Sequence, residues 1–186
     1  MKRHIILDLG CGYPWPVKNK HKVRHLLKKE FYIGLDMYAL SCYKTPPFEM
    51  GEEFRNIQNI QGSYYGQHLP FQTASIDEIL LFGAGGENPK HHTKEEMQRN
   101  RMILLNEIHR ILKIGGKFLS EKDNSYSPDY FTAFLTFQLM VDKRFTVKSH
   151  MYDISSYSDW TAKQIKRLIM LRGDIAARVY EAKKIK

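Results

Sequence analysis

The feature that most constrains this chain is a short apolar segment near its start that runs directly into a glycine loop. Ile5-Ile6-Leu7-Asp8-Leu9 has the continuous apolar character of a buried strand, and Gly10-Cys11-Gly12 follows it. Glycine has no Cβ, so the backbone after such a strand can turn sharply and lie against a ligand. In an open α/β sheet, small molecules bind at this position, outside the carboxyl end of the first strand. We therefore expect the functional site at this loop.

The rest of the chain alternates between strand-like and helix-like segments. Further strands are expected over residues 31–36, 57–61, 76–82, 117–120, 145–152 and about 175–183. Helices are expected over about 18–29, 93–113, 127–142 and 159–171. This alternation predicts an α/β fold with a doubly wound, Rossmann-like, seven-stranded sheet, mostly parallel with an antiparallel edge strand. No repeat or linker interrupts the chain, so residues 1–186 are expected to form a single domain.

The best-defined helix begins after Thr93. Thr93 and Glu96 have the spacing of a capping box, and apolar residues recur after them at helical spacing. Lys113 is expected in the last turn, where a cation complements the helix dipole. Gly115-Gly116 is expected to stop the helix at its carboxyl end.

Composition favours a folded protein in a reducing compartment. Of the 186 residues, 42% are hydrophobic, which suits a globular core, and no apolar run is long enough to span a membrane. Cys11 and Cys42 are too few for a disulfide scaffold or a cysteine-based zinc site. The adjacent side chains of His91 and His92 diverge and lack partners at ligand spacing, so no metal site is expected. We expect a cytoplasmic protein without a membrane association.

The chain is basic, with a formal net charge of +9 and a sequence pI near 9.4. Clustered lysine and arginine side chains favour a nucleic acid or another anionic partner. A solvated basic surface without such a partner has the same composition. Charge alone leaves both interpretations open.

Four stretches of the chain carry a pattern in a fixed order. They are Ile6 through Gly12, then Gly34-Leu35-Asp36, then Leu69-Pro70-Phe71 with Ser75-Ile76-Asp77, and the segment from Glu107 to Gly116. In this order they resemble the motifs along the sheet of a class I S-adenosylmethionine-dependent methyltransferase of the short, single-domain, type 11-like form. Asp77 and Glu107 are interpreted as structural residues that orient loops and a helix.

The resemblance implies S-adenosyl-L-methionine as the cofactor. Asp8 would face its ammonium group, and Asp36 would accept hydrogen bonds from the two ribose hydroxyls. The residues after the third strand would approach the adenine, and those after the fourth would flank the sulfonium. The implied cofactor-binding residues are Asp8, Gly10, Cys11, Gly12, Asp36, Met37, Ser63, Tyr64 and Gly83.

The sequence departs from the family pattern at two positions. Pro14 stands where the family often has a third glycine, so the loop is stiffer. Ser63 stands where the family often has an acid, and a hydroxyl binds an amino group more weakly than a carboxylate does. A nicotinamide dehydrogenase is disfavoured because the third glycine of its G-x-G-x-x-G motif would fall on Trp15.

No catalytic residue is assigned from the sequence. The candidate bases near the carboxyl ends of the strands are Tyr13, Glu87, His91 and His92. The Asn/Asp-Pro-Pro-aromatic motif of many amino-group methyltransferases is absent after the fourth strand, where Gly83-Ala84-Gly85-Gly86 stands. That difference disfavours planar nitrogen acceptors.

Three functions agree with the sequence. The favoured one is a methyltransferase that acts on a small molecule, because no separate recognition domain is evident. The first alternative is an RNA or nucleic-acid methyltransferase that uses the basic surface. The second is a non-catalytic protein that keeps the cofactor fold as a binding or regulatory subunit. A monomer or a homodimer is expected.

Overall fold

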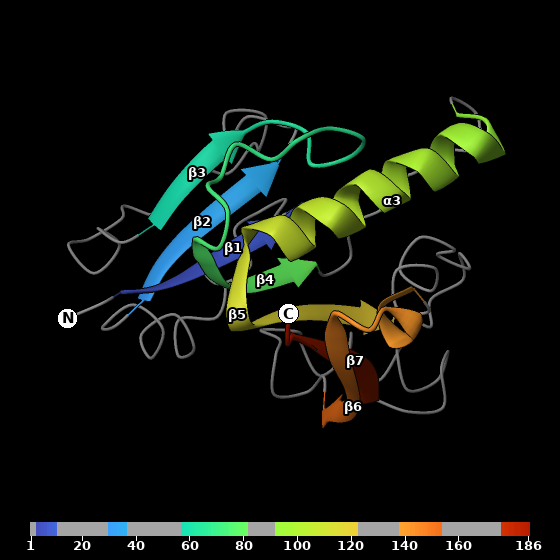
Figure 1. Ribbon diagram of the computed structural model, residues 1–186. Helices are drawn as coiled ribbons and strands as arrows, with labels where there is room; N and C mark the ends of the chain where they lie inside the picture. The colour runs from blue at the N-terminus through green and yellow to red at the C-terminus, as the bar shows by residue number, and fades with distance from the viewer. Residues whose placement is uncertain (1–2, 11–29, 37–56, 82–91, 123–137, 154–175) are drawn as a thin grey trace, which may run out of the picture.

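In the part of the chain that the structure describes, seven strands form one sheet in the order β3-β2-β1-β4-β5-β7-β6 (Figure 1). The computed structural model describes residues 3–10, 30–36, 57–81, 92–122, 138–153 and 176–186. The strands are β1 (His4–Leu9), β2 (Glu30–Asp36), β3 (Ile57–Gln61), β4 (Ile76–Leu81), β5 (Leu112–Lys122), β6 (Phe145–Asp153) and β7 (Ala176–Lys184). The positions of all seven strands were predictable from the sequence, and only β5 has bounds that differ by more than one residue, starting five residues earlier and ending two residues later than predicted.

The pairing confirms the predicted doubly wound, mostly parallel sheet. Strands β1 to β5 pair in parallel, whereas β7 is antiparallel to both of its neighbours, β5 and β6. The chain proceeds outward from β1 through β2 to β3, and then returns to β4 on the other side of β1. The strand order therefore reverses at β1, and in such sheets ligands bind at the carboxyl side of that reversal.

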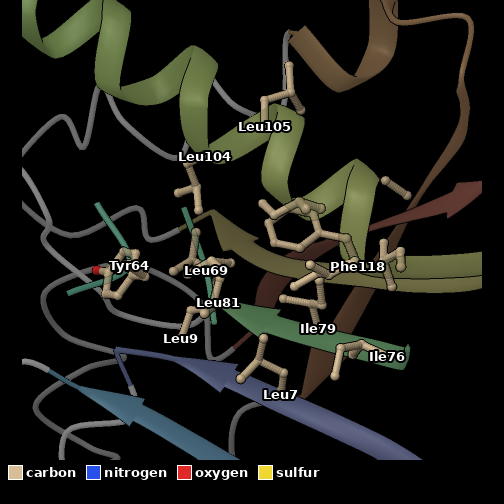
Figure 2. Packing of buried hydrophobic residues seen from close by; sticks show 14 of the residues in the cluster. Leu7, Leu9, Tyr64, Leu69, Ile76, Ile79, Leu81, Leu104, Leu105 and Phe118 are labelled. Atoms are coloured by element: carbon tan, nitrogen blue, oxygen red, sulfur yellow. The ribbon is translucent and has the colours of Figure 1, made fainter. Parts of the chain in front are cut away.

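A hydrophobic cluster fills the space between one face of the sheet and helix α3 (Lys94–Ile111) (Figure 2). Alternate residues of β1 and β2 contribute apolar side chains from the sheet, and α3 contributes apolar side chains from the other side of the cluster. The largest completely buried members include Leu7, Leu9, Leu35, Ile79, Leu81, Leu104, Leu105, Ile108 and Phe118. Because side chains alternate along a strand, Ile6 and Asp8 point to the opposite face of the sheet.

The amino-terminal end of α3 agrees with the predicted capping box. The Glu96 amide donates to the Thr93 hydroxyl at 3.2 Å, and the Thr93 amide donates to the Glu96 carboxylate at 2.8 Å. Two backbone amides that the helix leaves unpaired are thereby satisfied.

The predicted carboxyl end of this helix is wrong. The helix ends at Ile111, and Leu112 is already extended and pairs with Ile76 as the first residue of β5. A lysine from a distant strand replaces the predicted glycine stop: the Lys184 ammonium donates to the carbonyls of His109 at 2.7 Å and Leu112 at 2.8 Å. Terminal carbonyls satisfied in this way need no glycine cap.

Lys113 and the two glycines therefore belong to β5 rather than to the helix. The Lys113 ammonium lies 2.6 Å from the Asp77 carboxylate, which also accepts the Ile5 amide. The β4–β5 register shifts here, and Gly115 has a φ of +81°, a conformation that favours glycine. A Cβ on Gly116 would lie 2.9 Å from the Lys113 carbonyl oxygen.

Replacing Gly116 with alanine should lower the free energy of unfolding by about 2 kcal/mol, because two backbone oxygens obstruct the added methyl group. The second is the Asp77 carbonyl oxygen at 3.0 Å. Gly62→Ala is the matched control, since its Cβ would meet only the Leu35 side chain, at 3.4 Å. Urea denaturation of both variants checks this prediction, and equal losses would contradict it.

Part of the predicted helix content lies outside the described residues. Residues 138–141 are helical, in agreement with the carboxyl end of the helix predicted over 127–142. The remainder of that helix and the predicted helices over 18–29 and 159–171 fall outside the described ranges. Within those ranges, the helical segments are too short or too polar to cross a membrane. The assignment of residues 1–186 to a single domain stays a prediction.

Candidate functional site

The carboxyl ends of β1, β2 and β3 meet at one edge of the sheet. The Gly10 amide donates to the Leu35 carbonyl at 2.8 Å, and the Gly62 amide donates to the Asp36 carbonyl at 2.8 Å. Gly10 has a φ of +67°, so the chain leaves β1 in a conformation that a residue with a Cβ rarely adopts. The glycine predicted to turn the chain after the first strand does so.

A buried carboxylate lies beside this edge. Asp8 is 4% exposed, and its Oδ2 accepts a hydrogen bond from the hydroxyl of Tyr32, which is 3% exposed. In the parallel β1–β2 register, Tyr32 lies opposite Ile6, the residue two positions before Asp8. Tyr32 and Asp8 therefore project from the same face of the sheet, away from α3.

Burial raises the pKa of Asp8 from 3.8 to about 7. The hydrogen bond from Tyr32 acts in the opposite direction, and the negative charge of Asp36 raises this pKa further. A buried carboxylate next to a second carboxylate is destabilised as an anion. A cation that binds between them would relieve both effects.

Asp36 is the last residue of β2 and is partly exposed. Asp8 pairs with Gly34, and Leu9 pairs with Leu35. Gly10 and Asp36 therefore occupy the next position of the same register. A carboxylate at the end of the second strand, beside the turn that follows the first, is well placed to accept hydrogen bonds from vicinal hydroxyls.

The residues after β3 form a tight turn. The Ser63 hydroxyl accepts the Tyr65 amide at 3.1 Å and lies 3.3 Å from the Tyr65 carbonyl, so it is engaged within the loop. Tyr64 is buried and belongs to the hydrophobic cluster (Figure 2). The expected approach of Ser63 and Tyr64 to an adenine stays a prediction.

The loop is tied to the amino-terminal part of α3. The Tyr65 hydroxyl donates to the Met97 carbonyl at 3.4 Å, and its ring packs edge-on against His92 with centroids 6.1 Å apart. Of the four candidate bases, His92 is the one that lies within the described residues. It lies next to the first turn of α3, which extends beyond the ends of the parallel strands (Figure 1).

Glu107 anchors the second half of this loop. It is 3% exposed and accepts the Leu69 amide at 2.7 Å, His68 Nδ1 lies 3.0 Å away, and the Arg110 guanidinium donates to both of its oxygens. Arg110 also donates to the carbonyls of Leu69 and Phe71. The hydrogen bonds from Arg110, then His68 and Leu69, lower the pKa of Glu107 to about 2 against the opposing effect of burial. These contacts agree with the structural role inferred for Glu107.

Of the predicted site residues, the structure brings Asp8, Gly10 and Asp36 together, with Ser63 and Tyr64 in the loop that follows β3. The other predicted residues lie outside the described ranges: Cys11, Gly12, Tyr13, Met37, Gly83, Glu87 and His91. Tyr32 is a contact of the site that the sequence did not identify. Tyr32 lies four residues before Asp36 on β2, and side chains alternate along a strand, so Tyr32 lies on the same face of the sheet as Asp36 and Asp8. No cluster of three or more potential metal ligands occurs among the residues described.

Comparison with solved structures identifies the fold. An S-adenosylmethionine-dependent methyltransferase from Mesorhizobium loti superposes with a TM-score of 0.56, 15% identity, and coverage of 97% of this chain and 91% of that one. Geranyl diphosphate C-methyltransferase from Streptomyces coelicolor A3(2), solved with Mg²⁺, geranyl diphosphate and S-adenosyl-L-homocysteine, gives 0.54 at 15% identity and coverage of 98% and 74%.

A third match comes from the complex between the Haloferax volcanii Trm112 methyltransferase activator and a methyltransferase. It has a TM-score of 0.52, 16% identity and coverage of 98% and 84%. No protein-family model and no curated protein matches the sequence. At these identities the likeness concerns the fold, which is that of class I S-adenosylmethionine-dependent methyltransferases.

Proposed function

We propose that this chain, which has the class I methyltransferase fold, binds S-adenosyl-L-methionine and transfers its methyl group to an acceptor. The observation that carries the proposal is the meeting of Asp8, Gly10 and Asp36 at the strand-order reversal of that fold. The residues fit the cofactor chemically. Asp8 is a buried carboxyl group whose charged form lacks a compensating cation among the described residues, and the cofactor carries an ammonium group.

In this proposal, each of these three residues would help to hold the cofactor. Asp8 would bind the ammonium group, Asp36 the ribose hydroxyls, and the backbone at Gly10 would lie close to the amino-acid portion. When bound, S-adenosylmethionine supplies a methyl group already activated by a sulfonium. In the transfer, the acceptor forms a bond to the methyl carbon while the carbon–sulfur bond breaks and sulfur keeps the electron pair.

We further propose a small-molecule acceptor, as the sequence favours. An acceptor that loses a proton on methylation would pass it to a base or to water. Among the candidate bases, His92 has a described position, next to the loop that follows β3. The roles of Tyr13, Glu87 and His91 stay predictions.

Calorimetric titration with S-adenosylmethionine, with S-adenosylhomocysteine and with NAD tests the proposal. We expect heat and a rise in melting temperature with the first two ligands and neither with NAD. The absence of both effects for S-adenosylmethionine would exclude the enzyme and leave a non-catalytic protein. Transfer of a labelled methyl group to metabolite and RNA pools then identifies the acceptor class. Labelled RNA, with binding that weakens steeply as salt increases, would favour the nucleic-acid alternative.

A further inference from the structure

We propose that Tyr32 is a positioning residue of the cofactor site, whose hydroxyl holds the Asp8 carboxylate ready for the cofactor's ammonium group. The inference rests on the proposed function and adds a residue to it. It begins with the contact itself: the Tyr32 hydroxyl donates to Oδ2 of Asp8, and both residues are almost completely buried. This bond leaves the second carboxylate oxygen, Oδ1, to other partners.

The strand register fixes the orientation of the pair. Tyr32 and Asp8 lie on neighbouring strands with parallel pairing, two register positions apart on the same face. Both backbones are held in the centre of the sheet, where β1 is flanked by β2 and β4. A side chain held by such a contact loses few additional degrees of freedom when a ligand binds, which favours affinity.

The bond also stabilises the charged form of Asp8. The described groups that act on Asp8 are the Tyr32 hydroxyl, which lowers its pKa, and the Asp36 carboxylate, which raises it. Glu78, on the neighbouring strand β4, pairs instead with His4 at 3.5 Å. Only the ionised form of Asp8 attracts an ammonium group strongly, so a residue that favours ionisation strengthens binding at neutral pH.

Tyr32→Phe should weaken S-adenosylmethionine binding about fivefold at pH 7, and by nearly tenfold at pH 6, because Asp8 loses the bond that favours its charge. The pH midpoint of binding should rise by roughly one unit, so the variant should approach the wild type at pH 8.5. Titration calorimetry at pH 6, 7 and 8.5 measures both effects. A structural role alone would weaken binding equally at every pH, and that result would overturn the inference.

Two control variants isolate the effect. Tyr180→Phe removes the hydroxyl of another buried tyrosine, on β7, and should leave binding unchanged at each pH. Asp8→Asn should remove this pH dependence, and adding Tyr32→Phe to it should cost little more affinity. Thermal unfolding of each variant shows whether the fold is retained.

The titration of Asp8 in the free protein gives a readout that needs no cofactor. The labelled side-chain carboxyl carbon of Asp8, followed by NMR, should titrate near pH 7 and at a higher pH in Tyr32→Phe. An unchanged midpoint would overturn the inference even if the wild type binds the cofactor. The wild type could bind no cofactor while the titration midpoint of Asp8 still rises in Tyr32→Phe. That result would overturn the proposed function and the cofactor role of Tyr32, but it would support the hydrogen bond between Tyr32 and Asp8.

Discussion

Replacing Glu107 with alanine should lower the free energy of unfolding by about 3 kcal/mol. The substitution removes an anion that is 3% exposed, and it leaves the Arg110 guanidinium without its carboxylate partner. It also leaves the buried Leu69 amide without an acceptor. Urea denaturation at pH 7 measures the loss.

A surface ion pair provides the matched control. Glu181 lies 3.1 Å from Lys117, whose side chain is 46% exposed, and Glu181→Ala should cost less than about 1 kcal/mol. If both variants lost the same stability, the Glu107 network would be no more than another surface contact.

The same network predicts an acid sensitivity. Because the folded protein holds the pKa of Glu107 at about 2, below its ordinary value of 4.5, the charged group stabilises the fold above about pH 4.5. That contribution should be lost as the pH falls toward 2. Unfolding of the wild type and of Glu107→Gln across this range should show a smaller pH dependence in the variant.

The strands and the start of α3 could be predicted because their determinants are local. Buried strands appear as short apolar runs, and the capping box of Thr93 and Glu96 lies within one helical turn. The end of α3 could not be predicted, because its terminal carbonyls are satisfied by Lys184, 75 residues from His109 along the chain. The glycines that resembled a helix stop serve instead where the β4–β5 register shifts.

In the candidate site, too, the features with local determinants could be predicted, and those that depend on contacts between separate segments could not. Asp8, Gly10 and Asp36 each end or follow an apolar run, so their position at the sheet edge followed from the order of the strands. Tyr32 looked like one more apolar residue of its strand, and its contact with Asp8 depends on how two separate strands pair. The turn that engages the Ser63 hydroxyl depends on the conformation of the loop after β3, which residue types alone did not specify.

Asp36→Ala should weaken S-adenosylmethionine binding on the order of a hundred-fold, because two hydrogen bonds from the ribose hydroxyls to a carboxylate are lost. Asp36→Asn, which keeps one acceptor oxygen, should give a smaller loss. Glu78→Ala, which removes a carboxylate that pairs with His4 two register positions before Asp8, should leave affinity unchanged. Titration calorimetry compares the three variants, and unchanged affinity in Asp36→Ala would refute the ribose assignment.

The pH profile separates the contact made by Asp36 from its charge. The negative charge of Asp36 raises the pKa of Asp8, so Asp36→Ala should move the pH midpoint of binding downward. Tyr32→Phe should move the same midpoint upward, because it removes a bond that lowers that pKa. If Asp36 acted only through its charge on Asp8, Asp36→Ala would strengthen binding near pH 7. A large loss of affinity combined with a lower midpoint therefore requires a direct contact between Asp36 and the cofactor.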